Sequence, residues 1–201
     1  MARPSNTEER RQQIVQGLLQ VMSERGYERA SIAEIARAAG LSAGLVHYHF
    51  TQKQEILLAL VEQLAARVRE RVKSRLERAR GGARARVDAF LEAFLATGED
   101  ADPASVSAWV TISAEAMRQP EVRAAYEKVV RADLGLLEDL VGAVIGQRRA
   151  RAVAAGLFSA VQGYFVLSAA APELIPPGSA ASTVKRMAAG LLDAAQPSET
   201  P

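Results

Sequence analysis

Chemistry-bearing side chains gather in the stretch GLSAGLVHYHF, residues 40–50, which holds a serine, a tyrosine and both histidines of the chain. A Gly-x-Ser-x-Gly pattern could mark the nucleophile of a hydrolase, but such a serine follows a strand and its triad histidine comes later in the chain. Here the residues before Ser42 favour a helix, and the two histidines follow within seven positions. His47 and His49 would point to nearly opposite sides of a helix, so one metal ion cannot bind both. We therefore expect no enzyme activity, no metal site and no cofactor.

The same stretch could instead read DNA. Ser31 followed by Glu34 has the spacing of a capping box, so a short helix is expected from there to Gly40. Ser42 is a second candidate N-cap and opens another short helix toward Phe50. Two short helices joined in this way form a helix-turn-helix, in which the second helix enters the major groove of DNA.

Candidate DNA contacts lie on the second short helix and at the helix N-termini. Small residues let the backbone come close to DNA, and hydroxyl and imidazole groups can reach phosphate oxygens or base edges. Backbone amides at helix N-termini also favour phosphate. The alternative for each residue is an ordinary solvent or core contact. The candidates are Ser31, Ser42, Ala43, Gly44, His47, Tyr48 and His49, with Lys53 as a further phosphate contact.

Residues 31–57, SIAEIARAAGLSAGLVHYHFTQKQEIL, resemble the DNA-binding signature of the TetR family of transcriptional regulators. One position departs from the pattern, because His47 stands where members commonly carry tyrosine, and Tyr48 follows it. The resemblance implies an obligate homodimer with two helix-turn-helix units on a near-palindromic operator, and a helical C-terminal domain that holds a ligand pocket. The matching residues are Ile35, Ala36, Ala39, Gly40, Leu41, Ser42, Gly44, Phe50 and Lys53.

Helical periodicity runs through nearly the whole chain, and no stretch shows the sustained alternation of a strand. We predict an all-α fold, with an N-terminal three-helix helix-turn-helix DNA-binding domain and a C-terminal helical ligand-binding and dimerisation domain. The expected parts are the DNA-binding domain at 1–52, a connecting helix at 53–80, the C-terminal domain at 81–196 and a disordered tail at 197–201. Thr51 and Gln54 repeat the capping-box spacing at the start of the connecting helix. Later helices are expected at 84–97, 103–118, 121–145, 148–171 and 180–194.

Composition is that of an ordinary water-soluble globular protein, with 49% apolar and 24% charged residues. Residues 1–80 hold 14 basic and 9 acidic side chains, whereas residues 81–201 hold 11 and 14, so a polyanion partner suits the first part alone. The absence of cysteine and the polar, charged N-terminus favour the cytoplasm. The most apolar stretch, 152–171, carries Gln162, so we expect a buried or interface helix and no membrane span.

The C-terminal half offers candidates for an effector pocket, with core or dimer packing as the alternative for each. A polar group on an apolar face needs a partner, and a ligand is one option. Residues 109–123 are faintly similar to the choline-responsive repressor subgroup, which implies that Glu115 near Trp109 could receive a quaternary ammonium group. The candidate ligand-binding residues are Phe94, Trp109, Glu115, Tyr126, Phe158 and Gln162.

Small residues within 152–171 would permit close approach of another helix. This helix and the last one are therefore expected to form a symmetric four-helix dimer interface. Its candidate residues are Leu157, Phe158, Val161, Phe165, Met187 and Leu191.

These observations together predict a ligand-responsive transcriptional regulator, in the first place a repressor. Its homodimer would hold two recognition helices roughly 34 to 36 Å apart on double-stranded DNA. A small-molecule effector would tilt the connecting helix and change this separation. The alternative is a helical ligand-binding or scaffolding protein that retains the motif without specific DNA binding.

Overall fold

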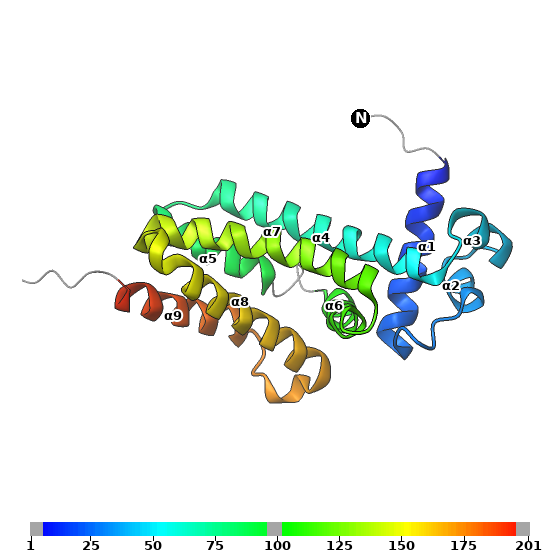
Figure 1. Cartoon of the computed structure of the whole chain (residues 1–201). Coiled ribbons are helices and arrows are strands. Elements are labelled where there is room, and N and C mark those ends of the chain that lie inside the picture. Colours follow the sequence, from blue (N-terminus) through cyan, green and yellow to red (C-terminus); the bar gives the residue numbers. More distant parts are fainter. Residues whose placement is uncertain (1–5, 96–101, 196–201) are drawn as a thin grey trace, which may run out of the picture. The chain divides into compact units, whose positions relative to one another are not determined.

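The computed structural model describes residues 6–95 and 102–195, and the secondary structure within these ranges is entirely helical (Figure 1). The prediction of an all-α protein is confirmed. The predicted end of a helix near Thr97 and the predicted tail at 197–201 lie outside the described residues. The elements are α1 (Asn6–Arg25), α2 (Ile32–Ala38), α3 (Ala43–His49), α4 (Lys53–Arg78), α5 (Ala83–Phe94), α6 (Pro103–Ala116), α7 (Pro120–Ile145), α8 (Gln147–Ala170), the 3-10 turn η2 (Pro172–Leu174) and α9 (Ser179–Ala194).

Side-chain caps set the starts of the two short helices. Ser31 and Glu34 form the expected capping box, in which the Glu34 amide donates to Ser31 Oγ at 3.2 Å and the Ser31 amide donates to Glu34 Oε2 at 3.0 Å. Ser42 Oγ accepts from the Leu45 amide at 3.2 Å and caps α3. Gly40 follows the C-terminus of α2 and has a φ of +67°, a conformation that residues other than glycine rarely adopt.

The prediction that Gln54 caps the start of α4 is wrong. The Thr51 amide donates to Glu55 Oε2 at 2.9 Å, four residues on, and not to Gln54. The Gln54 side chain instead donates to Gln119 and Glu121. The helix accordingly begins at Lys53, two residues beyond Thr51.

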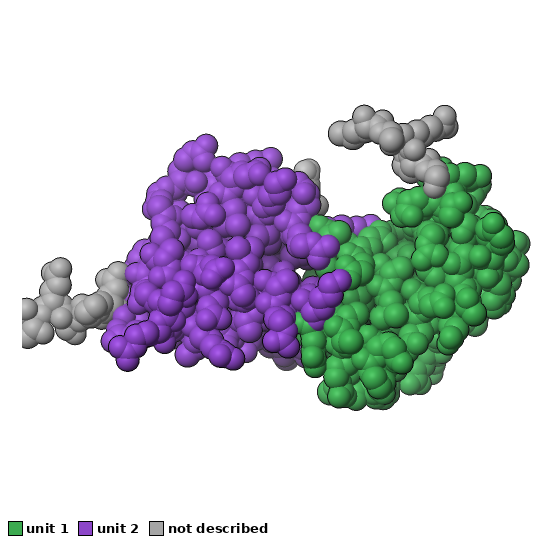
Figure 2. Space-filling model, turned by 45° about the horizontal axis from the view of Figure 1, so that its top comes forward, with its two compact units in different colours: residues 1–66, 103–127 green, residues 67–102, 128–201 purple. Residues whose placement is uncertain are grey.

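Contacts divide the chain into two compact units (Figure 2). Unit 1 comprises residues 1–66 and 103–127, and unit 2 comprises residues 67–102 and 128–201. Unit 1 is therefore discontinuous in sequence, because it combines α1, α2 and α3 with α6 and the first part of α7, whereas the predicted parts are consecutive segments. α4 and α7 each contribute residues to both units.

The core of unit 1 lies where α1 packs on α2, α3 and α6. Its members come from every helix of the unit, and the helix-turn-helix therefore shares one apolar interior with α4 and α6. The fully buried side chains include Ile14, Leu18, Ile35, Val46, Phe50, Ile56, Leu57, Leu60 and Ile112.

The core of unit 2 is built where α5 and α8 pack on α9. The ring centroid of Phe94 lies 4.8 Å from that of Phe90 and 5.6 Å from that of Phe158 in this core. The aliphatic members include Leu91, Leu137, Leu157, Val161, Val184 and Leu192.

Among the described helices, α8 is long and apolar enough to cross a membrane by length and composition. Core helices of water-soluble proteins can pass the same test. Here Ala154, Leu157, Phe158 and Val161 line a buried stripe of α8, while small residues occupy much of the rest.

Candidate DNA-binding and effector sites

α3 is anchored on one side and open on the other. Val46 and Phe50, at helical spacing, are 0% and 1% exposed and fix the helix to the core. Tyr48 is 80% exposed, the largest value among the exposed large apolar side chains of the described residues. His47 is exposed as well, as are Ser42, Ala43 and Gly44 at the start of the helix. The structure therefore brings most of the predicted DNA contacts onto one accessible surface.

The last turn of α3 is held by a residue that the sequence analysis missed. Arg11 donates from its guanidinium to the His49 carbonyl oxygen at 2.6 Å, and its Cζ lies 4.0 Å from the centroid of the Phe50 ring. A cation at a helix C-terminus is favourable for the helix dipole. His49 is half-buried, with its ring edge-on to Tyr48 at 5.1 Å. Arg11 thus positions α3, and nothing in its local sequence marks it among the arginines of α1.

Ser31 and Lys53 have partners within the protein. The Ser31 hydroxyl donates to Glu34 and also accepts from its amide, so it is committed to the capping box. Lys53 Nζ donates to the carbonyl oxygens of Tyr27 at 2.9 Å and Glu28 at 3.4 Å, and it lies 4.2 Å from the centroid of the Tyr27 ring. Burial lowers the pKa of Lys53. These two bonds use two of the three ammonium donors, so a phosphate contact by Lys53 would rely on the remaining N–H.

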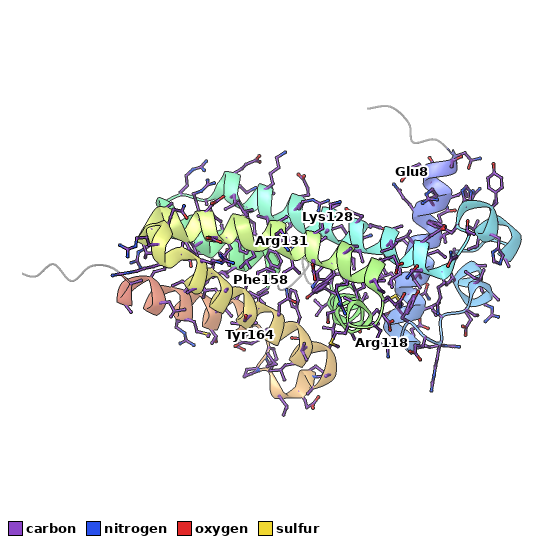
Figure 3. All side chains as sticks on the ribbon, viewed as in Figure 1. Glu8, Arg118, Lys128, Arg131, Phe158 and Tyr164 are labelled. Atoms are coloured by element: carbon purple, nitrogen blue, oxygen red, sulfur yellow. The ribbon has the colours of Figure 1, made fainter. Side chains whose placement is uncertain are left out.

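Glu115 is a buried carboxylate of unit 1, at 4% exposure. Its Oε1 accepts from Arg118 at 2.5 Å and its Oε2 from Gln119 at 2.7 Å, so its charge is already compensated. Arg118, labelled in Figure 3, also pairs with Glu28 at 3.2 Å. Burial, with the nearby Glu115 charge, raises the pKa of Tyr27 to about 12. Glu115 therefore belongs to a polar network of the protein, and its predicted contact with a ligand stays a prediction.

The same network reaches the first turn of α4. Gln54 Nε2 donates to Gln119 Oε1 at 2.9 Å and to Glu121 Oε2 at 3.3 Å. Arg123 closes the turn between α6 and α7 by donating to the carbonyl oxygens of Ala116 and Met117, each at 3.0 Å. Hydrogen bonds thus connect the α6–α7 turn with the residue that follows Lys53, a long-range arrangement that no local sequence pattern indicates.

The predicted effector residues fall into two groups. Trp109 and Tyr126 belong to unit 1, where their ring centroids are 5.1 Å apart at an interplanar angle of 32°. Phe94, Phe158 and Gln162 belong to unit 2. Within the described residues, the buried Nε2 of Gln162 has no hydrogen-bond partner, an arrangement that is costly unless another group completes it.

The predicted dimer residues differ in burial, and the prediction needs correction for the three that are buried. Leu157 and Val161 are 0% exposed and Phe158, which is labelled in Figure 3, is 5% exposed, because all three pack into the core of unit 2. A partner chain cannot contact such side chains at the surface. Met187 and Leu191 are 46% and 41% exposed and remain candidates, as does the half-buried Phe165 on α8.

Comparison with known proteins adds sequence relatives over most of the chain. The family model described as bacterial regulatory proteins, tetR family, matches residues 14–60, and the model of the BetI-type transcriptional repressor, C-terminal, matches residues 83–193. The HTH-type transcriptional regulator BetI of Rhizobium meliloti is 30% identical over 162 residues, which cover 78% of this chain and 76% of that protein. BetI of Cronobacter sakazakii is 29% identical over 163 residues, with coverage of 80% and 79%.

Solved structures share the fold. A transcriptional regulator from Rhodococcus has a TM-score of 0.80 at 23% identity and covers 95% of this chain, which in turn covers 99% of that one. A regulator from Saccharomonospora viridis in complex with choline has a TM-score of 0.75 at 21% identity, with coverage of 92% and 96%.

Proposed function

The chain belongs to the TetR family of transcriptional regulators, with a C-terminal domain of the BetI type, and we propose that it is a homodimeric repressor released from its operator by a small organic cation. Its general function is that of a ligand-responsive transcriptional regulator. The proposal assigns it no enzymatic reaction and places it in the cytoplasm, where a bacterial regulator meets its operator.

The DNA-binding part of the proposal rests on the geometry of α3. Val46 and Phe50 are buried in the core, so α3 cannot rotate about its axis, and Arg11 holds its last turn. The opposite side offers small residues, an imidazole and a phenol to the solvent. A recognition helix requires this arrangement, because base edges can be read only by side chains that are free and held in a fixed register.

We expect Tyr48→Ala to weaken operator binding at least about fivefold, since a single good contact to DNA contributes about 1–3 kcal/mol. The measurement is fluorescence anisotropy on DNA from the region beside the protein's own gene, with scrambled DNA as a control, at two salt concentrations. Lys53→Gln is the matched comparison, and it should weaken binding less because Lys53 is bonded to the protein. Equal, salt-sensitive binding of both DNAs would favour a ligand-binding or scaffolding protein without specific DNA recognition.

The effector part of the proposal is supported by the pair Trp109 and Tyr126. Two aromatic rings at 5.1 Å offer electron-rich faces, which attract organic cations. The chain has a BetI-type C-terminal domain, and one structural neighbour was solved with choline. A quaternary ammonium compound such as choline is therefore the first effector to test.

Trp109 is the only tryptophan of the chain, so its fluorescence reports on this site without labelling. Choline chloride should change the emission saturably, whereas sodium chloride at the same ionic strength should not. Tyr126→Ala should raise the Kd for choline about tenfold, in line with a desolvated cation–π contact of up to about 2 kcal/mol. Tyr48→Ala should leave this Kd unchanged while losing operator binding. A linear, unsaturated response to choline would reject the cation assignment.

The homodimer part predicts an interface on the exposed side of α9. Leu191→Arg combined with Met187→Arg should yield monomers in sedimentation velocity with little loss of monomer stability, because both side chains are exposed in the protomer. Met117→Arg, which charges a 73% exposed side chain of unit 1, is the control and should stay dimeric. A double variant that still sediments as a dimer would move the interface elsewhere. Phe158→Arg is unsuitable because it charges the core.

A further inference from the structure

A groove of about 960 Å³ opens in unit 2 between α4, α5 and α9. Its volume is in the range of small-molecule sites. One wall is a ridge of arginines on α4, where Arg67, Arg71, Arg75 and Arg78 follow at intervals of four, four and three residues and so share a helix face. None of the candidate effector residues lines it, so this groove is separate from the proposed choline site.

The lining carries an excess of positive charge. Six cationic side chains face three carboxylates, those of Glu70, Asp88 and Glu92. Glu92 is shared between Lys185, at 2.5 Å, and Arg75, at 3.6 Å. The six cations are Arg67, Arg71, Arg75, Arg78, Arg80 and Lys185.

Arg67 pairs with Asp102 at 3.8 Å, so the excess is concentrated where α4 ends. Within the described residues, Arg78 has no ion-pair partner, and Arg80 donates only to the backbone carbonyl oxygens of Glu77 and Ala79. The small side chains of Ala85 and Ala89 form part of the lining, and weakly polar walls strengthen the field of nearby charges. Burial raises the pKa of Asp88, so the charge of this carboxyl group is more easily neutralised when an anion approaches.

We propose that this groove binds a small multivalent anion with two or three negative charges carried by phosphate or carboxylate groups. Guanidinium groups recognise both groups through paired hydrogen bonds. An extended polyanion such as nucleic acid is disfavoured, because a phosphate backbone that runs along the groove must pass Asp88 and Glu92 of α5, whereas a compact anion needs only Arg78 and Arg80. A compact anion can lie against the arginine ridge and the end of α4 instead.

The test is calorimetric titration of the full chain with sodium pyrophosphate and with sodium citrate, in 50 mM sodium chloride. We expect one site per chain with a Kd below about 1 mM for one of the two anions; the tighter anion identifies the phosphate or the carboxylate class. The double variant Arg78→Gln with Arg80→Gln should weaken binding at least tenfold. Neither side chain has a carboxylate partner among the described residues, so the variant is expected to fold.

The matched control is the double variant Lys73→Gln with Arg86→Gln, which removes the same charge from exposed positions of α4 and α5 outside the lining. Its Kd for the anion should lie within twofold of the Kd of the parent protein. No heat beyond that of sodium chloride at equal ionic strength, or an equal loss in both double variants, would overturn the proposal. The groove and the proposed choline site have no residue in common, so a failure of the anion titration leaves the choline proposal unaffected.

Discussion

Gly17→Ala is expected to abolish operator binding and to lower the free energy of unfolding by about 1–3 kcal/mol, the usual cost of overpacking. Gly17 lies in α1 against α2, and a Cβ there would come within 2.6 Å of the Ile35 carbonyl oxygen and 3.0 Å of the Ala39 amide nitrogen. Both are backbone atoms, so no side-chain rotation relieves the clash. The helix-turn-helix would have to shift away from α1, and α3 with it.

Urea unfolding and operator anisotropy measure the two effects of Gly17→Ala. Gly135→Ala is the control, because a Cβ at this position of α7 meets nothing within 4 Å. It should raise the stability by about 0.5–1 kcal/mol, the gain from replacing glycine inside a helix. A Gly17→Ala protein with the parent's urea midpoint would contradict the close packing of α1 on α2 at Gly17.

Asp133→Asn is expected to stabilise the protein above pH 6.5, by up to about 3 kcal/mol from a shift of roughly two pKa units at 1.36 kcal/mol each. Burial raises the pKa of Asp133 to about 6, and the nearby Arg69 offsets only part of that. With a raised pKa, the folded state holds the proton more tightly than the unfolded state. The destabilisation from Asp133 is thus absent below pH 3.8, grows as the pH rises and is complete above about 6.

Thermal unfolding between pH 4 and 8 tests this dependence. The difference in melting temperature between the parent and Asp133→Asn should be small at pH 4 and reach its maximum near pH 7. Asp139→Asn, which changes an exposed carboxyl group of the same helix, is the matched control. A constant difference across the whole pH range would mean that lost contacts, and not ionisation, separate the two proteins.

Local patterns predicted the helices well because their causes are local. The Ser31 and Ser42 caps each depend on a partner three residues away, and the structure confirms both. The same spacing misled at Thr51, where Gln54 and Glu55 compete for one amide and the carboxylate is the stronger acceptor. Gln54 could then bond to Gln119, which lies 65 residues on.

The parts that could not be predicted depend on contacts between distant segments. Nothing near Lys53 indicates that two carbonyl oxygens, 25 and 26 residues earlier, bind its ammonium group. Glu115 was correctly singled out as a polar group on an apolar face that needs a partner. In the structure Arg118 and Gln119 are its hydrogen-bond partners, which the local sequence pattern does not identify.

The discontinuity of unit 1 has a consequence for protein engineering. Chimaeric regulators are made by grafting the N-terminal segment of one protein onto the C-terminal segment of another. A graft of residues 1–66 alone would leave behind residues 103–127, and with them the α6 surface that packs on α1 and the Gln119 that binds Gln54. A hybrid that also transplants 103–127 would keep the DNA-reading unit whole, so functional modularity in this protein follows contacts in space and not a single cut in the chain.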